Sequence, residues 1–109
     1  MSWDPVRPRF DELIHAPTRL RITAALATSA ELEFSTLEEV LGISVSLLSK
    51  QLKVLSDAGY VVLEKRPQPF GRPRTWIRFT GRGRVAYLSH VEALRQLTTP
   101  DATHDHGDG

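Results

Sequence analysis

At 109 residues the chain has room for one domain with a single modest core. It contains no cysteine, which excludes disulfides, thiolate metal sites and cysteine nucleophiles. No apolar run approaches the roughly 20 residues needed to span a bilayer. The N-terminal stretch MSWDPVRPRF lacks an apolar signal-peptide core, so we expect a cytoplasmic protein.

The charges are segregated along the chain, although the net charge is only +1. Residues 50–84 hold nine Lys or Arg against two acidic residues, a net charge of +7. Residues 1–49 hold four cations and seven anions, and residues 85–109 hold one cation and four anions, so each of these segments has a net charge of −3. A basic segment of this kind favours a polyanionic partner, and the alternative is a charge-rich solvated surface.

Two helices are predicted before residue 30. The apolar residues of RFDELIH, at positions 10, 13 and 14, predict a short amphipathic helix. Pro17 suits the first turn of a second, Ala-rich helix that we expect to run to about Ser29, because the N–H that proline lacks would be unpaired there. The following ELEF is expected to form a short strand or an extended link.

A third helix is predicted from residue 35. Ser35 and Glu38 have the spacing of a capping box, in which each side chain satisfies a backbone N–H at the helix start. Gly42 offers the left-handed residue that commonly ends a helix. The expected buried face consists of Leu37, Val40 and Leu41.

A fourth helix follows almost at once, with Ser44 as its N-cap and Gly59 at its end. Its apolar residues recur at the spacing of one buried helical face: Val45, Leu48, Leu52 and Leu55. Two capped helices joined by so short a turn predict a helix-turn-helix.

The segments YVVLEKR and RTWIRF are rich in β-branched and aromatic residues and predict a β-hairpin with the long tip PQPFGRP. The prolines at 67, 69 and 73 cannot join a strand ladder, and Gly71 permits a turn. Thr80 is a candidate cap for a last helix from about Gly81 to Leu97. Residues 99–109 are polar and predict a disordered tail.

This order of elements, with LGISVSLLSKQLKVLSDAGYVVLEKR and GRPRTWIRFTGRGR in register, resembles the winged-helix domain of MarR and ArsR type transcriptional regulators. The resemblance implies an α+β, mainly α fold: a winged helix-turn-helix with a two- to three-stranded wing sheet and a long C-terminal helix. It covers roughly residues 10–98, preceded by an N-terminal arm, residues 1–9. It implies a sequence-specific regulator that binds double-stranded DNA.

A helix-turn-helix places its second helix in the major groove, and a basic hairpin tip suits the DNA backbone or the minor groove. The candidate DNA-binding residues are Ser46, Ser49, Lys50, Gln51, Lys53, Arg66, Arg72 and Arg74. The alternative for those of the helix is that they form only the polar face of an amphipathic helix. Trp76 is expected to pack in the core or a groove, and stacking on a base is its alternative.

A homodimer is predicted, because the last helix and the N-terminal segment carry more apolar surface than a small core requires. The candidate interface residues are Phe10, Leu13, Ile14, Leu88, Val91, Leu94 and Leu97. Such pairing would present two recognition helices about 34 Å apart to one face of DNA. The alternative is that these residues cover the core of their own chain.

Two other function classes compete with DNA binding. His15 and His90 have no carboxylates at a spacing that predicts a zinc or acid/base site, so we expect no enzyme, no metal and no cofactor. His104-Asp105-His106 lies in the predicted tail and could bind only a stray metal. A winged helix used for protein–protein or RNA contact is the second alternative, because a fold does not determine function.

Overall fold

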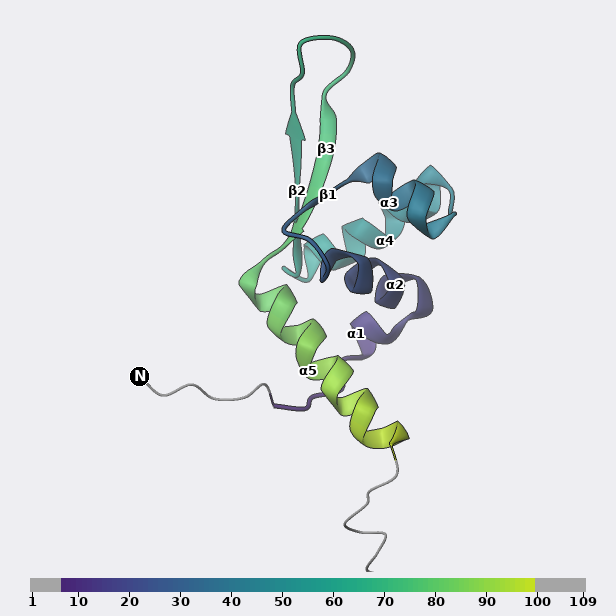
Figure 1. Cartoon of the computed structure of the whole chain (residues 1–109), viewed down its shortest axis with the longest axis vertical. Helices are drawn as coiled ribbons and strands as arrows, with labels where there is room; N and C mark the ends of the chain where they lie inside the picture. Colours follow the sequence, from purple (N-terminus) through teal and green to yellow (C-terminus); the bar gives the residue numbers. More distant parts are fainter. Residues whose placement is uncertain (1–6, 100–109) are drawn as a thin grey trace, which may run out of the picture.

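The computed structural model describes residues 7–99 (Figure 1). In chain order the elements are α1 (Glu12–His15), α2 (Pro17–Leu26), β1 (Leu32–Glu33), α3 (Phe34–Leu41), α4 (Val45–Asp57), β2 (Val61–Arg66), β3 (Arg74–Phe79) and α5 (Gly81–Thr98). This order confirms the predicted, mainly helical fold with a small sheet and a long last helix. Most of the predicted arm and all but Thr99 of the predicted tail lie outside the described residues.

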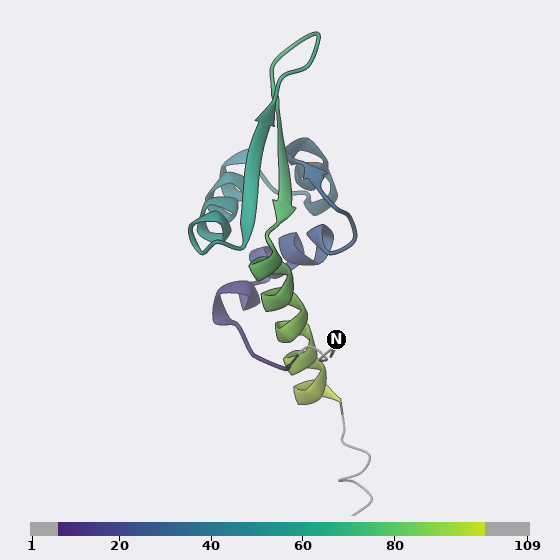
Figure 2. The same ribbon diagram turned by 90° about the vertical axis from the view of Figure 1, so that its left-hand side faces the viewer.

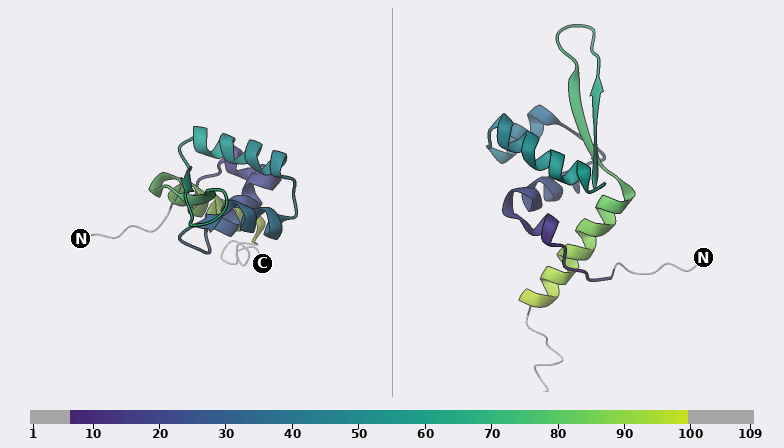
Figure 3. Two further views of the ribbon diagram at one scale, coloured as in Figure 1. Left: turned by 90° about the horizontal axis from the view of Figure 1, so that it is seen from above. Right: turned by 180° about the vertical axis from the view of Figure 1, so that it is seen from behind.

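The core lies between the three helices α2, α3 and α4 and the inner face of the sheet. Leu48, Leu52 and Leu55 of α4 are completely buried and form the predicted apolar stripe. They join one cluster whose other buried members are Ile22, Leu26, Leu37, Leu41, Val61, Ile77 and Phe79. In the view from behind in Figure 3, α4 runs toward the base of the hairpin, which rises beyond the helices.

The sheet has the strand order β1-β3-β2, and both pairs are antiparallel. Strand β1 pairs Leu32 with Ile77 and Glu33 with Trp76, so the short strand expected in ELEF consists of its two central residues. Strands β2 and β3 pair from Val61 opposite Phe79 to Arg66 opposite Arg74. Residues 67–73, which we call the hairpin tip, connect them and project beyond the helices (Figure 2).

Local capping signals account for most of the helix boundaries. The Ser44 hydroxyl accepts a hydrogen bond from the Leu47 N–H at 3.1 Å, and the Thr80 hydroxyl accepts one from the Gly83 N–H at 2.9 Å. Gly42 has φ of 65°, the left-handed conformation that favours glycine, and ends α3. Asp11 caps α1 by accepting hydrogen bonds from the Leu13 and Ile14 N–H groups.

The predicted capping box of α3 is wrong. The N-cap residue is Glu33, and no side chain caps this helix start. Because Leu32 and Glu33 are held in the ladder with β3, the helix begins directly at Phe34, which places Ser35 inside the first turn. The second helix is also shorter than predicted and ends at Leu26.

Two valines that we expected in the core are exposed. Val40 is 64% exposed, because the buried stripe of α3 is the narrow set Phe34, Leu37 and Leu41, and Val40 lies beside it. Val45 is 51% exposed, because it occupies the first turn of α4, beyond the core cluster. Both apolar side chains are therefore available on the surface.

Helix α5 leaves the end of β3, contacts α1 and continues beyond it (Figure 1). Its start is pressed against the backbone of Tyr60, since a Cβ placed on Gly83 would lie 1.9 Å from the Tyr60 carbonyl oxygen. Within residues 7–99, no helix combines the length and the apolar character that a membrane crossing requires.

Candidate nucleic-acid interface

Helix α4 presents a polar face to solvent. Its apolar stripe is anchored in the core, so the opposite side of the helix points away from the other elements. Ser46, Ser49, Lys50 and Lys53 are all exposed on that side, as predicted from the helical spacing. Short hydroxyl side chains permit close approach of a helix to DNA, and lysines reach base acceptors or phosphates.

Lys53 forms an ion pair with Asp57, four residues later, at 3.1 Å. Both side chains are more than half exposed, and exposed pairs of this type contribute little to stability. Phosphate can therefore compete with Asp57 for the ammonium group. Within residues 7–99, no carboxylate lies within ion-pair distance of Lys50.

Gln51 has a structural partner that its sequence position did not reveal. Its side-chain oxygen accepts a hydrogen bond of 2.6 Å from Arg19 of α2, and Arg19 also donates to the Leu13 carbonyl at 2.7 Å. Gln51 is half-buried and connects α4 to α2, and Arg19 extends this link to α1. Its amide NH₂ group and the second lone pair of its oxygen remain for any part that it takes in DNA binding.

The hairpin tip is held in shape by local features. Gly71 has φ of 85°, a conformation that side-chain-bearing residues rarely adopt. The Gln68 amide nitrogen donates a hydrogen bond of 2.8 Å to the Arg72 carbonyl across the turn. The Arg72 side chain is exposed, and no carboxylate of the described residues is paired with it.

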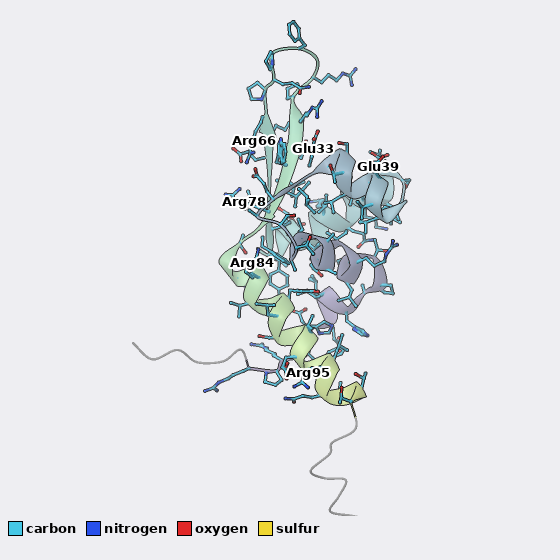
Figure 4. The ribbon with its side chains drawn as sticks, in the orientation of Figure 1. Glu33, Glu39, Arg66, Arg78, Arg84 and Arg95 are labelled. Atoms are coloured by element: carbon cyan, nitrogen blue, oxygen red, sulfur yellow. The ribbon has the colours of Figure 1, made fainter. Side chains whose placement is uncertain are left out.

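The outer face of the sheet carries a network of charged side chains, and Figure 4 labels Glu33, Arg66 and Arg78 among them. The Arg66 guanidinium donates to both Glu31 oxygens, at 2.6 and 2.9 Å, and to Glu64 at 3.0 Å. Arg74 pairs with Glu33 at 3.0 Å, and the pair of Arg78 with Glu64 is longer, at 3.9 Å. These three arginines are thus matched by carboxylates from β1, from the residue before it and from β2.

The ion pair of Arg66 with Glu31 favours the ionised forms of both side chains. The hydrogen bond from Arg66 lowers the pKa of the Glu31 carboxyl, and the carboxylates of Glu31 and Glu64 raise the pKa of Arg66. The Arg66 guanidinium also lies over the Trp76 ring, 5.1 Å from the ring centroid. Trp76 therefore lies beneath a cation of its own chain on the outer face of the sheet, outside the buried core cluster, and stacking on a base stays its alternative.

This network changes the charge argument made from the sequence. Segment 50–84 is strongly basic along the chain, but in space Glu31 and Glu33 from the acidic first segment lie on the same sheet face. Arg66 and Arg74 are ion-paired, so their predicted roles in DNA binding stay predictions. The sequence signal for this network was the pair of glutamates two residues apart in ELEF, together with Arg74 and Arg78, which share one face of RTWIRF.

Predicted interface residues of the dimer divide into two groups. Ile14 is completely buried, because α1 turns this side chain inward, so the prediction that Ile14 lies in a dimer interface is wrong. Leu13 packs against the core of its own chain. Leu94 is half-buried. The others are exposed: Phe10 by 42%, Leu88 by 40%, Val91 by 38% and Leu97 by 73%.

A polar cluster at the junction of α1 and α5 was not predicted. His15 and His90, far apart in the sequence, lie with their ring nitrogens 3.2 Å apart, and His90 is completely buried. The His90 Nδ1 accepts a hydrogen bond of 2.9 Å from the Asp11 N–H, and the Phe10 ring packs against both imidazoles. Burial and the neighbouring His15 lower the pKa of His90. Among residues 7–99, no group of three or more potential ligands is placed to hold a metal ion.

Residues 18–98 of the chain match the protein family described as "Winged helix DNA-binding domain". The chain belongs to this family. The predicted winged-helix domain is thereby confirmed, and residues 67–73 are the tip of the wing.

Individual proteins are similar to this chain in sequence or in fold. The uncharacterized protein MJ0432 of Methanocaldococcus jannaschii is 31% identical over 87 residues, which cover 80% of this chain and 94% of that protein. The transcriptional regulator homologue from Pyrococcus horikoshii OT3 has a TM-score of 0.73 and 25% identity, over 80% of this chain and 85% of that one. A mutant MarR from E. coli, complexed with operator DNA, shares the fold with a TM-score of 0.56 and 20% identity, over 74% of this chain and 60% of that one.

Proposed function

We propose that this winged helix is a transcriptional regulator that binds double-stranded DNA at specific sequences. Helix α4 enters the major groove, and the hairpin tip contacts the backbone or the minor groove. The observation that carries the proposal is the exposed row of Ser46, Ser49 and Lys50 on α4, beside a projecting tip that carries Arg72. A family defined by DNA binding also supports the expectation that the chain is not an enzyme.

The ion pairs of the sheet suggest that the paired and the unpaired cations have different roles. Lys50, Lys65 and Arg72 are exposed, and no carboxylate of residues 7–99 is paired with them. Contacts of these three residues with phosphate cost the least free energy, because they break no existing ion pair. Arg66 and Arg74 must exchange Glu31 and Glu33 for phosphate, so we assign them first to holding the hairpin on β1.

We further propose that the protein binds DNA as a homodimer through α5. This helix extends beyond the body of the domain, and a helix that projects into solvent rarely carries exposed apolar side chains unless another surface covers them (Figure 1). Leu88, Val91 and Leu97 are exposed on α5, and Phe10 lies beside this helix, since the Arg9 N–H donates to the Ser89 carbonyl. Two-fold pairing would present two copies of α4 to one face of the duplex.

Selection of bound fragments from random duplex DNA tests the proposal directly. The expected result is a recovered motif made of two related half-sites, with tighter binding of the duplex than of single-stranded RNA of the same sequence. The alternative function, a protein–protein or RNA interaction module, predicts no enriched duplex motif. Failure to recover a motif from the untagged full chain would overturn sequence-specific binding. A cytoplasmic location and the lack of a metal or cofactor stay predictions.

A further inference from the structure

Phe70 is the residue of the hairpin tip that the proposed function leaves unexplained. Its side chain is 88% exposed, more than that of any other large apolar residue in the described part of the chain. The tip is also the part of the molecule that projects furthest from α5 (Figures 1 and 2). An aromatic ring fully in water at the end of a projecting hairpin contributes nothing to the core of its own domain.

The ring is carried by a stiffened support. Pro69 precedes Phe70 and fixes its own φ, while Gly71 follows in the left-handed conformation. The hydrogen bond from Gln68 to the Arg72 carbonyl closes the turn around Phe70. A side chain presented by a preorganised turn loses less conformational entropy when it binds, which favours a role in recognition.

The charges around the ring indicate the kind of partner. Arg72 is two residues away and exposed, and Lys65, also exposed, lies in the second strand pair below the tip. Arg66 and Arg74 form the pair next to the tip, and both they and Arg78 are held by glutamates. Proteins that bind the minor groove often combine cations on the backbone with an apolar side chain that wedges between base pairs.

We propose that Phe70 enters the minor groove and wedges between two stacked base pairs, with Arg72 on the adjacent phosphate or in the groove. The inference rests on the proposed function and deepens it, since the tip would distinguish DNA sequences by how easily a base step unstacks. Pyrimidine–purine steps unstack most easily, so the wedge would favour a flexible TA or CA step where the tip meets the duplex. It would also bend the DNA away from the minor groove.

An anionic membrane surface is the other partner that would suit an aromatic ring beside cations. The tip offers only one large apolar side chain, among Pro, Gln, Gly and Arg, which provides little area for insertion into lipid. The polar face of α4 beside the hairpin matches a duplex better than a bilayer. DNA is therefore the partner that the observations favour.

The test compares the wild-type chain with Phe70→Ala and Phe70→Leu on duplexes recovered by the selection. A 2-aminopurine base at the step under the tip reports unstacking as a rise in fluorescence, and energy transfer between dyes at the duplex ends reports bending. Phe70→Ala is expected to bind about tenfold more weakly, the scale of one lost stacked ring, and to abolish both signals. Phe70→Leu keeps an apolar wedge and is expected to retain most of the bend.

Each outcome decides between the two proposals. If Phe70→Ala binds, unstacks and bends the duplex like the wild type, the wedge is refuted and the proposed function stands. If the wild type binds no duplex, both proposals fall. A third arm uses vesicles of phosphatidylcholine and phosphatidylserine: loss of vesicle binding in Phe70→Ala, with DNA binding unchanged, would replace the DNA wedge by a membrane contact.

Discussion

The Tyr60 hydroxyl donates a hydrogen bond of 2.6 Å to the Asp11 carboxylate and so connects the end of the helix-turn-helix to the first helix. The other Asp11 oxygen caps α1, and the Asp11 N–H donates to His90 of α5. The hydrogen bond between Tyr60 and the Asp11 carboxylate raises the pKa of Tyr60, because the neighbouring carboxylate disfavours the phenolate. One aspartate thereby joins the element that would dimerise to the element that would read DNA.

Tyr60→Phe is expected to lower the free energy of unfolding by about 1.5–3 kcal/mol, the contribution of a hydrogen bond to a charged group. Urea denaturation followed by circular dichroism measures the change. Thr28→Val serves as the control, because the Thr28 hydroxyl bonds only a local carbonyl on the surface. Equal stabilities of Tyr60→Phe and the wild type would show that Asp11 is satisfied without Tyr60.

The glycines at the start of α5 are expected to differ sharply in their tolerance of a methyl group. Gly83→Ala would drive a Cβ into the Tyr60 carbonyl and should destabilise the domain by about 1–3 kcal/mol or more. Gly81→Ala is the matched control, because nothing lies within 4 Å of the position that its methyl group would take, and it should be neutral or stabilising by up to about 1 kcal/mol. Thermal unfolding of both variants measures the difference, and a similar loss in both would contradict the close approach.

The buried His90 predicts a dependence of stability on pH. Its pKa in the folded chain lies below the ordinary value of 6.5, so the unfolded chain binds the proton more readily. The contribution of neutral His90 is therefore complete above about pH 6.5 and is lost as the pH falls through the lowered folded-state pKa. The paired carboxylates Glu31 and Glu92 have lowered pKa values and lose their contribution only at more acidic pH, so the two effects separate.

Chemical denaturation between pH 7.5 and 5 measures this effect. The wild-type free energy of unfolding is expected to fall across the interval, while His90→Gln, which cannot be protonated, should show a flatter profile from a lower starting value. His15→Gln is the second variant, since His15 contacts the His90 Nε2 and lowers its pKa. A flat wild-type profile would mean that His90 does not titrate in this range.

Arg72 and Glu33 are expected to affect DNA binding in opposite directions. Arg72→Ala should weaken specific and random duplexes alike and reduce the slope of log Kd against log salt by about one unit. Glu33→Gln releases Arg74 from its ion pair, so it should tighten binding and steepen the slope. Titrations at three salt concentrations measure both. Unchanged binding in Arg72→Ala would leave the hairpin tip without a phosphate contact.

In the proposed complex Lys50 would face the base edges in the major groove, so Lys50→Ala should cost more binding free energy on the selected site than on random DNA. A loss of about 1–3 kcal/mol confined to the selected site is the scale of one base contact. Competition between the two duplexes in one titration measures the ratio. An equal loss on both would reassign Lys50 to the phosphate backbone.

Leu97→Glu is expected to separate a dimer into monomers without unfolding the domain, because Leu97 is 73% exposed and lies far along α5. Val40→Glu is the control, since Val40 is 64% exposed on α3, outside the proposed interface. Light scattering at micromolar concentration gives both masses. A monomeric mass for the wild type, with and without DNA, would refute the dimer.

The order and type of the elements were determined by local signals in the sequence. Ser44, Thr80 and Gly42 act on neighbouring backbone groups, and the apolar residues of α4 recur with the period of a helix. The hairpin tip was bounded correctly because prolines cannot continue a ladder. These signals need no knowledge of the rest of the chain.

The tertiary structure alone decided which distant side chains meet. Strand register places Glu33 beside Trp76 and brings Arg74 to Glu33, so a segment that is strongly basic along the chain is largely neutralised on its sheet face. Packing of α1 on α5 joins His15 to His90 across most of the sequence. The same pairing of β1 with β3 moved the start of α3 away from Ser35, because ladder hydrogen bonds between distant strands outweighed a local capping preference.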